Sequence, residues 1–446
     1  MKKSFLFACL LLSTTAFADL DPFSVYTMNA PEGCVEVSAQ KEELTLPDLI
    51  QVGICNNPTL NRSYMSVKSS EAAYGKSKSA YLPTVSADGS ISQSNTKTED
   101  ENTKKTHPYS GNIALSWLVY DFGGRSAKTD QMKANLETAE FSYNANLHDT
   151  VLAINQAYFD LLSAQEVLKS SQESEKSFKK SYEESKRRFD LGLVSASDKL
   201  LAKTTYENSR LDVVQAGNLL KKAQGALAVL LNLSPDTALK VATPPKKGDD
   251  ITKLETEETV QEMMETALSL RPELKGKKSE MTVAEQQIEI AKAGALPSLS
   301  AGAGAEYGDS WKLHNPYSVR TSIGLNLSVP LFNGFSDVYN IAKAKYDYRQ
   351  AVLSVVETQD SVRQDVWNSY QDYTTATEAY RISQTLLESA TENERVAFKS
   401  YQVGKGSILE LLTAGSQLAS AKQQVIVAFY SVLTSKANLY RAIGRF

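Results

Sequence analysis

The sequence predicts a mostly α-helical chain that also carries membrane β-strands, with one structural unit present twice. Three observations predict this fold class. The same order of motifs recurs after about 210 residues, several segments alternate apolar and polar residues, and two very long segments contain neither proline nor glycine. The chain has 446 residues, which is enough for two or three ordinary domains.

Residues 1–18 are predicted to be a secretory signal peptide. Lys2 and Lys3 precede the short apolar run 5–12, and residues 16–18, Ala-Phe-Ala, have the small-residue pattern of a cleavage site. The run is shorter than the roughly 18 apolar residues of a membrane helix, and no later stretch reaches that length. The mature chain is therefore expected to be either soluble or a membrane β-barrel, since only helices and closed barrels satisfy the backbone in lipid.

The net charge and the cysteines indicate which partners and which covalent bonds to expect. The formal charge is −4 and becomes −6 without the two lysines of the signal, which argues against nucleic acid as a partner. Cys34 and Cys55 remain in the exported chain, where an oxidising compartment favours a disulfide. That bond would close a loop of about 20 residues and contribute on the order of 3 kcal/mol, and the alternative is two unpaired buried thiols. Residues 6–9 resemble a lipoprotein cleavage box, which would leave the signal almost no apolar core.

A duplicated motif defines the domain organisation. The segment 57–60 (NPTL) matches 271–274 (RPEL) at an offset of 214 residues, and the Leu-Pro pair at 82–83 matches 296–297 at the same offset. Further matches follow along both halves of the chain, with small changes of offset that fit insertions in loops. One structural unit is therefore expected twice.

The two copies are expected to span 45–231 and 259–443. An N-terminal segment, 19–44, precedes the first copy. The linker 232–258 between the copies contains several prolines and is expected to be irregular.

Each copy contains two expected strands, about 83–93 and 111–122 in the first and about 297–307 and 317–331 in the second. In 318–329 apolar residues occupy every second position, which is the period of a strand with one apolar and one polar face. About ten residues per strand is the length that crosses an outer membrane when the strand is tilted.

Polar segments at 95–108 and 308–316 are expected to be solvated outer loops. Aromatic residues near the strand ends are typical of membrane interfaces; they are Tyr109, Trp117, Tyr120, Tyr307, Trp311 and Tyr317. The alternative is an ordinary soluble antiparallel sheet with one wet face.

Two long helices, about 125–188 and about 335–400, are expected after the strands. Their apolar residues recur close to every 3.5 residues, so we expect coiled-coil packing. The segments 189–195 and 401–407 contain glycine, which permits the left-handed backbone of a chain reversal. These segments are expected to be the tips of two helical hairpins.

Four strands per chain predict an oligomer. Even small membrane barrels need about eight strands, and open strand edges cannot face lipid. Identical copies are therefore expected to share one barrel.

These features together resemble the TolC family of outer-membrane efflux proteins, also called outer membrane factors. The resemblance covers about residues 40–443 and implies a homotrimer. Its 12-stranded β-barrel, with four strands per chain, continues as a long periplasmic α-helical barrel. The motifs that carry the resemblance are Asn57-Pro58, Tyr81-Leu82-Pro83, Arg188-Phe189-Asp190-Leu191-Gly192-Leu193-Val194-Ser195, Ala295-Leu296-Pro297, Val329-Pro330-Leu331-Phe332-Asn333-Gly334 and Tyr401-Gln402-Val403-Gly404-Lys405-Gly406-Ser407.

The resemblance also implies a function. Members of the TolC family are outer-membrane channels that passively conduct small toxic molecules, such as drugs, or type I secreted proteins. They work with an inner-membrane pump of the RND or ABC type and a periplasmic adaptor, the membrane fusion protein. We therefore expect the chain in the cell outer membrane, in contact with lipid and with a periplasmic extension. The alternative is a periplasmic coiled-coil adaptor or a structural scaffold, although no lipoyl-like β-domain interrupts the hairpins.

The family closes its periplasmic entrance by contacts between helices near the tips and places rings of acidic residues there. By this resemblance the gate contains Asp198, Tyr401 and Glu410. The alternative is that Asp198 and Glu410 are ordinary acids at helix N-termini, where the helix dipole favours them.

The gate of this chain departs from the family pattern. Gly406 stands where the best-known member has an arginine, and Thr413 stands where it has a second acidic ring residue. The Asp–Arg closing pair is therefore absent, and Lys405 is the candidate replacement. The tips are expected to dock the adaptor, or to be plain helix–helix turns; the docking residues are Gly192, Leu193, Val194, Ser195, Val403, Gly404, Gly406 and Ser407.

No residue pattern indicates catalysis. The histidines His107, His148 and His314 are scattered, no cysteine or histidine spacing suits a metal, and no nucleophile stands beside a base. The sequence predicts a protein that is not an enzyme and uses no cofactor or metal.

Overall fold

The computed structural model describes residues 43–98, 101–237, 239–242, 258–311 and 317–445 of the chain. These residues form two compact units, and each is described by itself. The sheet unit takes its described residues from 65–141 and 275–357, and the helical unit takes them from 43–64, 142–274 and 358–445.

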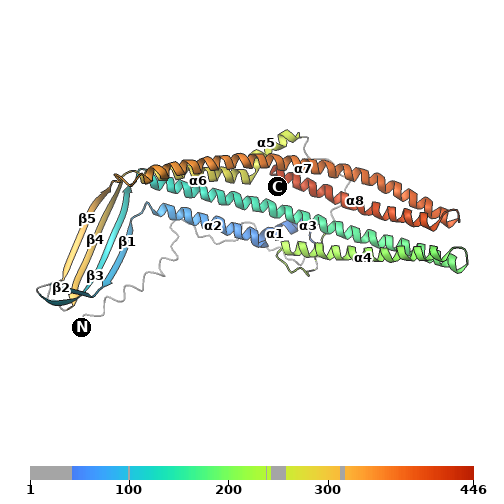
Figure 1. Cartoon of the computed structure of the whole chain (residues 1–446), viewed down its shortest axis with the longest axis horizontal. Coiled ribbons are helices and arrows are strands. Elements are labelled where there is room, and N and C mark those ends of the chain that lie inside the picture. The colour runs from blue at the N-terminus through green and yellow to red at the C-terminus, as the bar shows by residue number, and fades with distance from the viewer. Residues whose placement is uncertain (1–42, 99–100, 238, 243–257, 312–316, 446) are drawn as a thin grey trace. The chain divides into compact units, whose positions relative to one another are not determined.

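The sheet unit contains one antiparallel sheet (Figure 1). Its strands are β1 (Thr84–Ile91), β2 (Ser94–Thr98), β3 (Glu101–Tyr120), β4 (Ser298–Trp311) and β5 (Ser318–Ser328). The order across the sheet is β1-β3-β4-β5, and β2 pairs with the first part of β3. Because β3 pairs with β4, strands from both copies of the repeat lie side by side.

The two faces of the sheet differ in chemistry. Residues that pair across neighbouring strands point to the same face, so the pairing shows which side chains lie together. Val85 pairs with Leu115, Leu115 with Ala303, and Ala303 with Ile323, which gives an apolar row across all four strands. Val85 is 69% exposed and Ile323 is 90% exposed, so no core of the described chain covers this row. The adjacent row faces the other way and contains small residues, namely Ser86, Ala114, Gly304 and Ser322.

The prediction of two outer loops is wrong in part. The segment 95–108 was expected to be a loop, yet β2 and the first residues of β3 occupy most of it and pair from Ser94 with Thr106 onward. This hairpin satisfies its own backbone and needs no apolar face, so the apolar alternation that identifies the other strands is missing from it. The strand β4 also runs to Trp311, into the expected loop 308–316, whose last residues lie outside the described chain.

The helices repeat the same order in both halves of the chain (Figure 1). A short helix and a longer one precede the strands, and a helix of 67 residues follows them, with a break and a further helix at its end. The helices are α1 (Leu46–Asn56), α2 (Pro58–Ser79), α3 (Gly124–Asp190), α4 (Ala196–Leu230), α5 (Val260–Leu270), α6 (Pro272–Gly294), α7 (Ser336–Gln402) and α8 (Ile408–Ile443).

The NPTL motif has a local structural reason. Asn57 ends α1, and its side-chain oxygen accepts hydrogen bonds from the N–H groups of Thr59 at 2.9 Å and Leu60 at 3.2 Å. Asn57 is therefore the N-cap of α2, and Pro58 occupies the first helical position, where its missing N–H costs nothing. In the second copy Pro272 has the same place at the start of α6.

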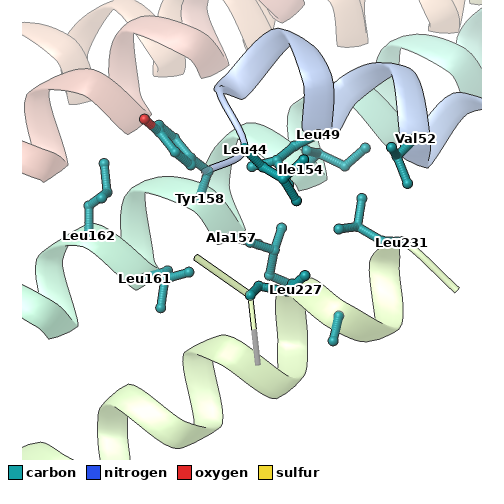
Figure 2. Close-up of a cluster of buried hydrophobic side chains, with 12 residues drawn as sticks. Leu44, Leu49, Val52, Ile154, Ala157, Tyr158, Leu161, Leu162, Leu227 and Leu231 are labelled. Carbon is teal, nitrogen blue, oxygen red and sulfur yellow. The ribbon is translucent and has the colours of Figure 1, made fainter. Parts of the chain in front are cut away.

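A buried cluster joins α1, α3 and α4 in the helical unit (Figure 2). Leu49 of α1, Ile154 and Leu161 of α3, and Leu227 of α4 have no exposed surface. A fully buried Leu or Ile side chain contributes about 1.5–3 kcal/mol relative to an exposed one. The hydroxyl of Tyr158, in the same cluster, donates a hydrogen bond to the Ala242 carbonyl at 2.7 Å. The start of the linker is thereby held against α3.

The second copy has an equivalent cluster between α5, α7 and α8, with Met263, Val366 and Leu439 buried. Here a charged network is added. Arg271 donates to Asp365 at 2.8 Å, and Arg441 donates to Asp149 at 2.6 Å and also to Glu273.

The carboxylate of Glu273 is the centre of this network. Burial acts to raise the pKa of Glu273, but the hydrogen bonds and charges of Arg271 and Arg441 outweigh burial and lower it. Glu273 therefore remains charged at neutral pH, and it links the start of α6 to the end of α8.

Cys55, close to the end of α1, is disulfide-bonded. Cys34 lies outside the described residues, so the pairing of Cys34 with Cys55 stays a prediction. Within the described residues, none of the helices is both long enough and apolar enough to cross a membrane.

We predict that Gly53→Ala destabilises the helical unit through one contact. A Cβ atom at this position would lie 2.2 Å from Cδ1 of the buried Ile154. Overpacking of this kind costs typically about 1–3 kcal/mol. Denaturant unfolding of the helical signal should show this loss, and Ile154→Val in the same chain should restore much of it because valine lacks the clashing methyl group. Strictly additive losses in the double variant would contradict this explanation.

Candidate functional site at the helical tips

The two breaks between long helices are built in the same way. In the first, the N–H of Leu193 bonds to the Arg188 carbonyl at 2.8 Å and that of Gly192 to the Phe189 carbonyl at 2.9 Å, with φ of Gly192 at +71°. This is the Schellman arrangement, which needs a left-handed residue, usually glycine, just after the helix. In the second, Gly404 with φ +76° takes the same place.

The helices end two residues later than the sequence predicted. Phe189 and Asp190 are still in α3, and Tyr401 and Gln402 are still in α7. The tip segments proper are therefore 191–195 and 403–407.

Each tip leads into a capping box. The N–H of Asp198 donates to Oγ of Ser195 at 3.1 Å, and the N–H of Ser195 donates back to the Asp198 carboxylate at 3.2 Å. Ser407 and Glu410 repeat this exchange at the start of α8, with both distances 3.2 Å. Both predicted gate acids therefore have a local structural role, which satisfies backbone donors at a helix N-terminus.

Below the tips lies a cluster of buried side chains that we call the tip cluster. It is formed by residues of all four long helices, namely Phe178, Ala202, Tyr401, Ile408, Leu411 and Leu412. Tyr182 of α3 and Tyr206 of α4 stack beside it with ring centroids 6.0 Å apart. The tip cluster holds the first hairpin (α3 with α4) against the second (α7 with α8).

Arg188 connects the two hairpins directly. Its Nη2 donates to the carbonyl oxygen of Gln402, in the last turn of α7, at 2.9 Å. Its guanidinium group lies 4.5 Å from the ring centre of Tyr401, a distance suited to a cation–π contact. On its own helix, Nε of Arg188 donates to Glu184 at 3.1 Å.

Glu184 orients this arginine. The hydrogen bonds from Arg187 and from Arg188 lower the pKa of Glu184, so its carboxylate is charged throughout the neutral range. Arg187 bonds to the same carboxylate at 2.6 Å, but its side chain is 70% exposed, whereas that of Arg188 is 18% exposed. Only Arg188 of the two has a hydrogen bond to α7 among the described residues.

Tyr401 is 4% exposed and sits where the two hairpins meet. Burial raises its pKa, while the Ser185 hydroxyl and the charge of Arg188 act in the opposite sense. Neither Oη of Tyr401 nor Oγ of Ser185, both buried, has a hydrogen bond of good geometry within the described chain. The phenol is therefore neutral and held mainly by packing.

The predicted gate residues are only partly brought together. The charge of Asp198 acts on Tyr401, but no hydrogen bond joins them within the described residues. Lys405 is exposed and has no ion pair in the part of the chain that the structure describes. A Cβ atom at Gly406 would lie 3.0–3.2 Å from Ser400 and from the Tyr401 backbone, so an arginine there would require this turn to shift.

The tips expose three large apolar side chains. Leu191 and Leu193 of the first tip are 74% and 71% exposed, and Val403 of the second is 68% exposed. Large apolar side chains exposed together commonly mark a protein-binding surface.

The comparisons with known proteins identify the family. The model of the family described as outer membrane efflux protein matches residues 49–233 and 263–445. The chain belongs to the outer membrane efflux protein family. This membership confirms the resemblance to the TolC family, the internal duplication and a non-enzymatic transport function.

Individual relatives cover nearly the whole chain. A probable efflux pump outer membrane protein, TtgC of Pseudomonas putida, is 26% identical over 90% of this chain and 82% of its own length. Outer membrane protein TolC of Escherichia coli is 23% identical over 91% of this chain and 83% of its own length. The crystal structure of the CmeC outer membrane channel of Campylobacter jejuni matches with a TM-score of 0.78 at 21% identity, covering 90% of this chain and 85% of that one.

These comparisons confirm the predicted fold class, which is mostly helical with a sheet of four long strands in each chain. They also confirm the predicted location in the outer membrane with a periplasmic helical extension. The protein is an outer-membrane efflux channel. Sequence reasoning assigned no role to Glu184 and Arg188. Arg188 stands in a motif that carried the resemblance, but only the packing of α3 against α7 reveals its partner.

Proposed function

We propose that three copies of this chain close one barrel in the outer membrane and form a passive exit duct. The support is the sheet itself. Among the described strands, β1 pairs only with β3 and β5 only with β4, so both outer edges lack a partner. Unpaired backbone groups in hydrocarbon cost several kcal/mol each, and a partner chain's edge can satisfy them.

The duct would work with an inner-membrane pump of the RND or ABC type and a periplasmic adaptor, which would bind the exposed tips. The relevant surface is Gly192, Leu193, Val194, Ser195, Val403, Gly404, Gly406 and Ser407. Small toxic molecules or secreted proteins are the proposed cargo, and the pump supplies both the energy and most of the selectivity.

The periplasmic entrance would be held closed at the tip cluster. Asp198, Tyr401 and Lys405 remain our proposed gate residues, and the hydrogen bond from Arg188 to Gln402 adds a direct polar contact between the two hairpins next to the tips. Opening requires the hairpins to separate, and this contact must then break.

The trimer and its pore can be tested together. The full-length protein in outer-membrane extracts should migrate as a trimer that dissociates on heating, and it should give discrete conductance steps in planar bilayers. A chain that stays monomeric in mild detergent and gives no conductance would overturn the proposal.

Arg188→Met should favour the open entrance. Loss of a charge-assisted hydrogen bond costs about 1.5–3 kcal/mol, so the ratio of open to closed channels should rise by roughly ten- to hundredfold in single-channel recordings. Arg187→Met is the matched control, since Arg187 shares the Glu184 carboxylate without a bond to α7, and its conductance should stay at the wild-type level. Asp198→Asn should also raise conductance, and so should Tyr401→Ala, which removes the ring packed in the tip cluster. If none of these three gate variants differs from wild type, the gate lies elsewhere.

Glu410 would form a ring of three carboxylates in the trimer, and close like charges attract cations. Glu410→Gln separates this role from capping, because glutamine can keep the capping box but carries no charge. We expect a lower cation preference in reversal-potential measurements with unchanged amide exchange at residues 408–411. Ser407→Ala is the converse control and should speed exchange there while leaving selectivity alone. Unchanged selectivity in Glu410→Gln would reduce Glu410 to a cap.

A further inference from the structure

A cavity of about 450 Å³ opens in the sheet unit between the end of α2 and the start of α3. Its size falls in the range of small-ligand sites, roughly 300–1,000 Å³. Part of the lining is apolar and comes from Ala73, Ala80 and Met132, Ser77 and Gly124 contribute small residues, and the other lining residues are charged.

Positive charge dominates this cavity. Lys76, Arg125 and Lys128 line it together with a single carboxylate, that of Asp121. Arg125 is already engaged, because it lies 3.4 Å from the Asp121 carboxylate and donates to the carbonyls of Leu118 and Val119.

The two lysines keep their charge available. Lys128 bonds to the neutral amide of Gln131 at 2.8 Å. Lys76 is exposed and makes no ion pair within the described residues. An anion in the cavity would therefore meet two ammonium groups that no carboxylate neutralises.

The cavity lies beside aromatic residues at the base of the sheet. Tyr81 follows the lining residue Ala80, and its ring lies 4.9 Å from the Arg125 guanidinium group. Trp117 of β3 donates from Nε1 to the Tyr81 carbonyl at 3.0 Å, and Tyr120 and Phe122 are in edge-to-face contact nearby along the chain. Exposed Trp and Tyr at the ends of membrane strands mark the level of lipid headgroups.

The second copy of the repeat provides an internal comparison. Lys76 corresponds to Ile290 at the offset of 214 residues that relates α2 to α6. At the offset of 212 residues that relates α3 to α7, Lys128 corresponds to Asn340, Arg125 to Asp337 and Asp121 to Asn333. The second copy thus has no cation at these positions, so the cationic lining belongs to the first copy alone.

We propose that this cavity binds the phosphate headgroup of an anionic phospholipid of the leaflet that faces the periplasm. Lys76 and Lys128 bind the phosphate oxygens, and the apolar wall contacts the glycerol region. Basic pockets at the membrane boundary of helices are a known way to hold such headgroups. The proposal rests on the placement of the sheet in the outer membrane and goes beyond the transport function.

The test uses the full-length protein in mild detergent and native mass spectrometry with added phosphatidylglycerol or phosphatidylcholine. Wild type should bind phosphatidylglycerol in preference. Lys76→Gln with Lys128→Gln should weaken that binding by roughly 30-fold, from the contribution typical of two lysines near a headgroup. Lys292→Gln with Lys343→Gln is the matched control, because these lysines of the second copy already pair with Glu289 and Asp347. The control should bind lipid as wild type does.

Three outcomes would overturn the proposal: equal binding of the two lipids, equal losses in both double variants, or full competition by millimolar inorganic phosphate, which would indicate a site for free anions. Lys76→Arg with Lys128→Arg keeps the charge and should keep the lipid, and loss of binding there would also count against the site. Conductance of each sample is recorded in parallel. A lipid-free variant that still conducts leaves the channel function standing, and a wild type without conductance challenges that function separately.

Discussion

The constraint on which the rest of the structure depends lies at the two edges of the sheet, where the outer backbone groups of β1 and β5 have no partner among the described strands. The strands β1, β3, β4 and β5 have apolar residues on one face of the sheet and small or polar residues on the other, and the apolar side chains are exposed. The described residues of the chain therefore give the sheet no hydrophobic core of the usual kind. Its stability must come from what surrounds it, with lipid against the apolar face and further strands at the edges of β1 and β5. The sequence could specify this only by keeping a strict alternation over each strand.

The change from sheet to helix strains the backbone at the same place in both copies. After β3, Phe122 and Gly123 have φ of +52° and +90°, and after β5, Gly334 and Phe335 have +70° and +66°. A phenylalanine with positive φ is costly, at about 1–3 kcal/mol, and persists only where the surroundings require it. In the first copy Asp121 contributes by accepting the Arg125 N–H at 2.7 Å, which caps α3. We conclude that the sharp turn from strand into long helix is set by tertiary structure in both copies, since the order of Phe and Gly is reversed between them.

Sequence patterns were sufficient for features with a local cause. The strands, the long helices and the glycine breaks each follow from spacing within about ten residues, and the Gly192 and Gly404 turns require glycine for their backbone angles. The hairpin of β2 was missed because Lys- and Thr-rich strands carry no apolar period. The bond from Arg188 to Gln402 joins residues 214 positions apart, and no local pattern can indicate which residues meet across two helical hairpins. The cationic cavity was missed for the same reason, since its walls come from separate helices.

The two copies of the repeat share the backbone structure of their helical tips, but they differ in the side chains that make contacts there. Both copies keep the Schellman turn and the capping box, which any hairpin tip needs. The contact of Arg188 at the tips is not duplicated. At the offset of 212 residues Arg188 corresponds to Ser400, so the bond from Arg188 to Gln402 has no counterpart that runs from the second hairpin to the first. Further from the tips, other contacts, such as that of Lys422 with Glu173, also join α8 to α3. Under the proposed gating, the contact at the tips would break while these other contacts keep the helices together.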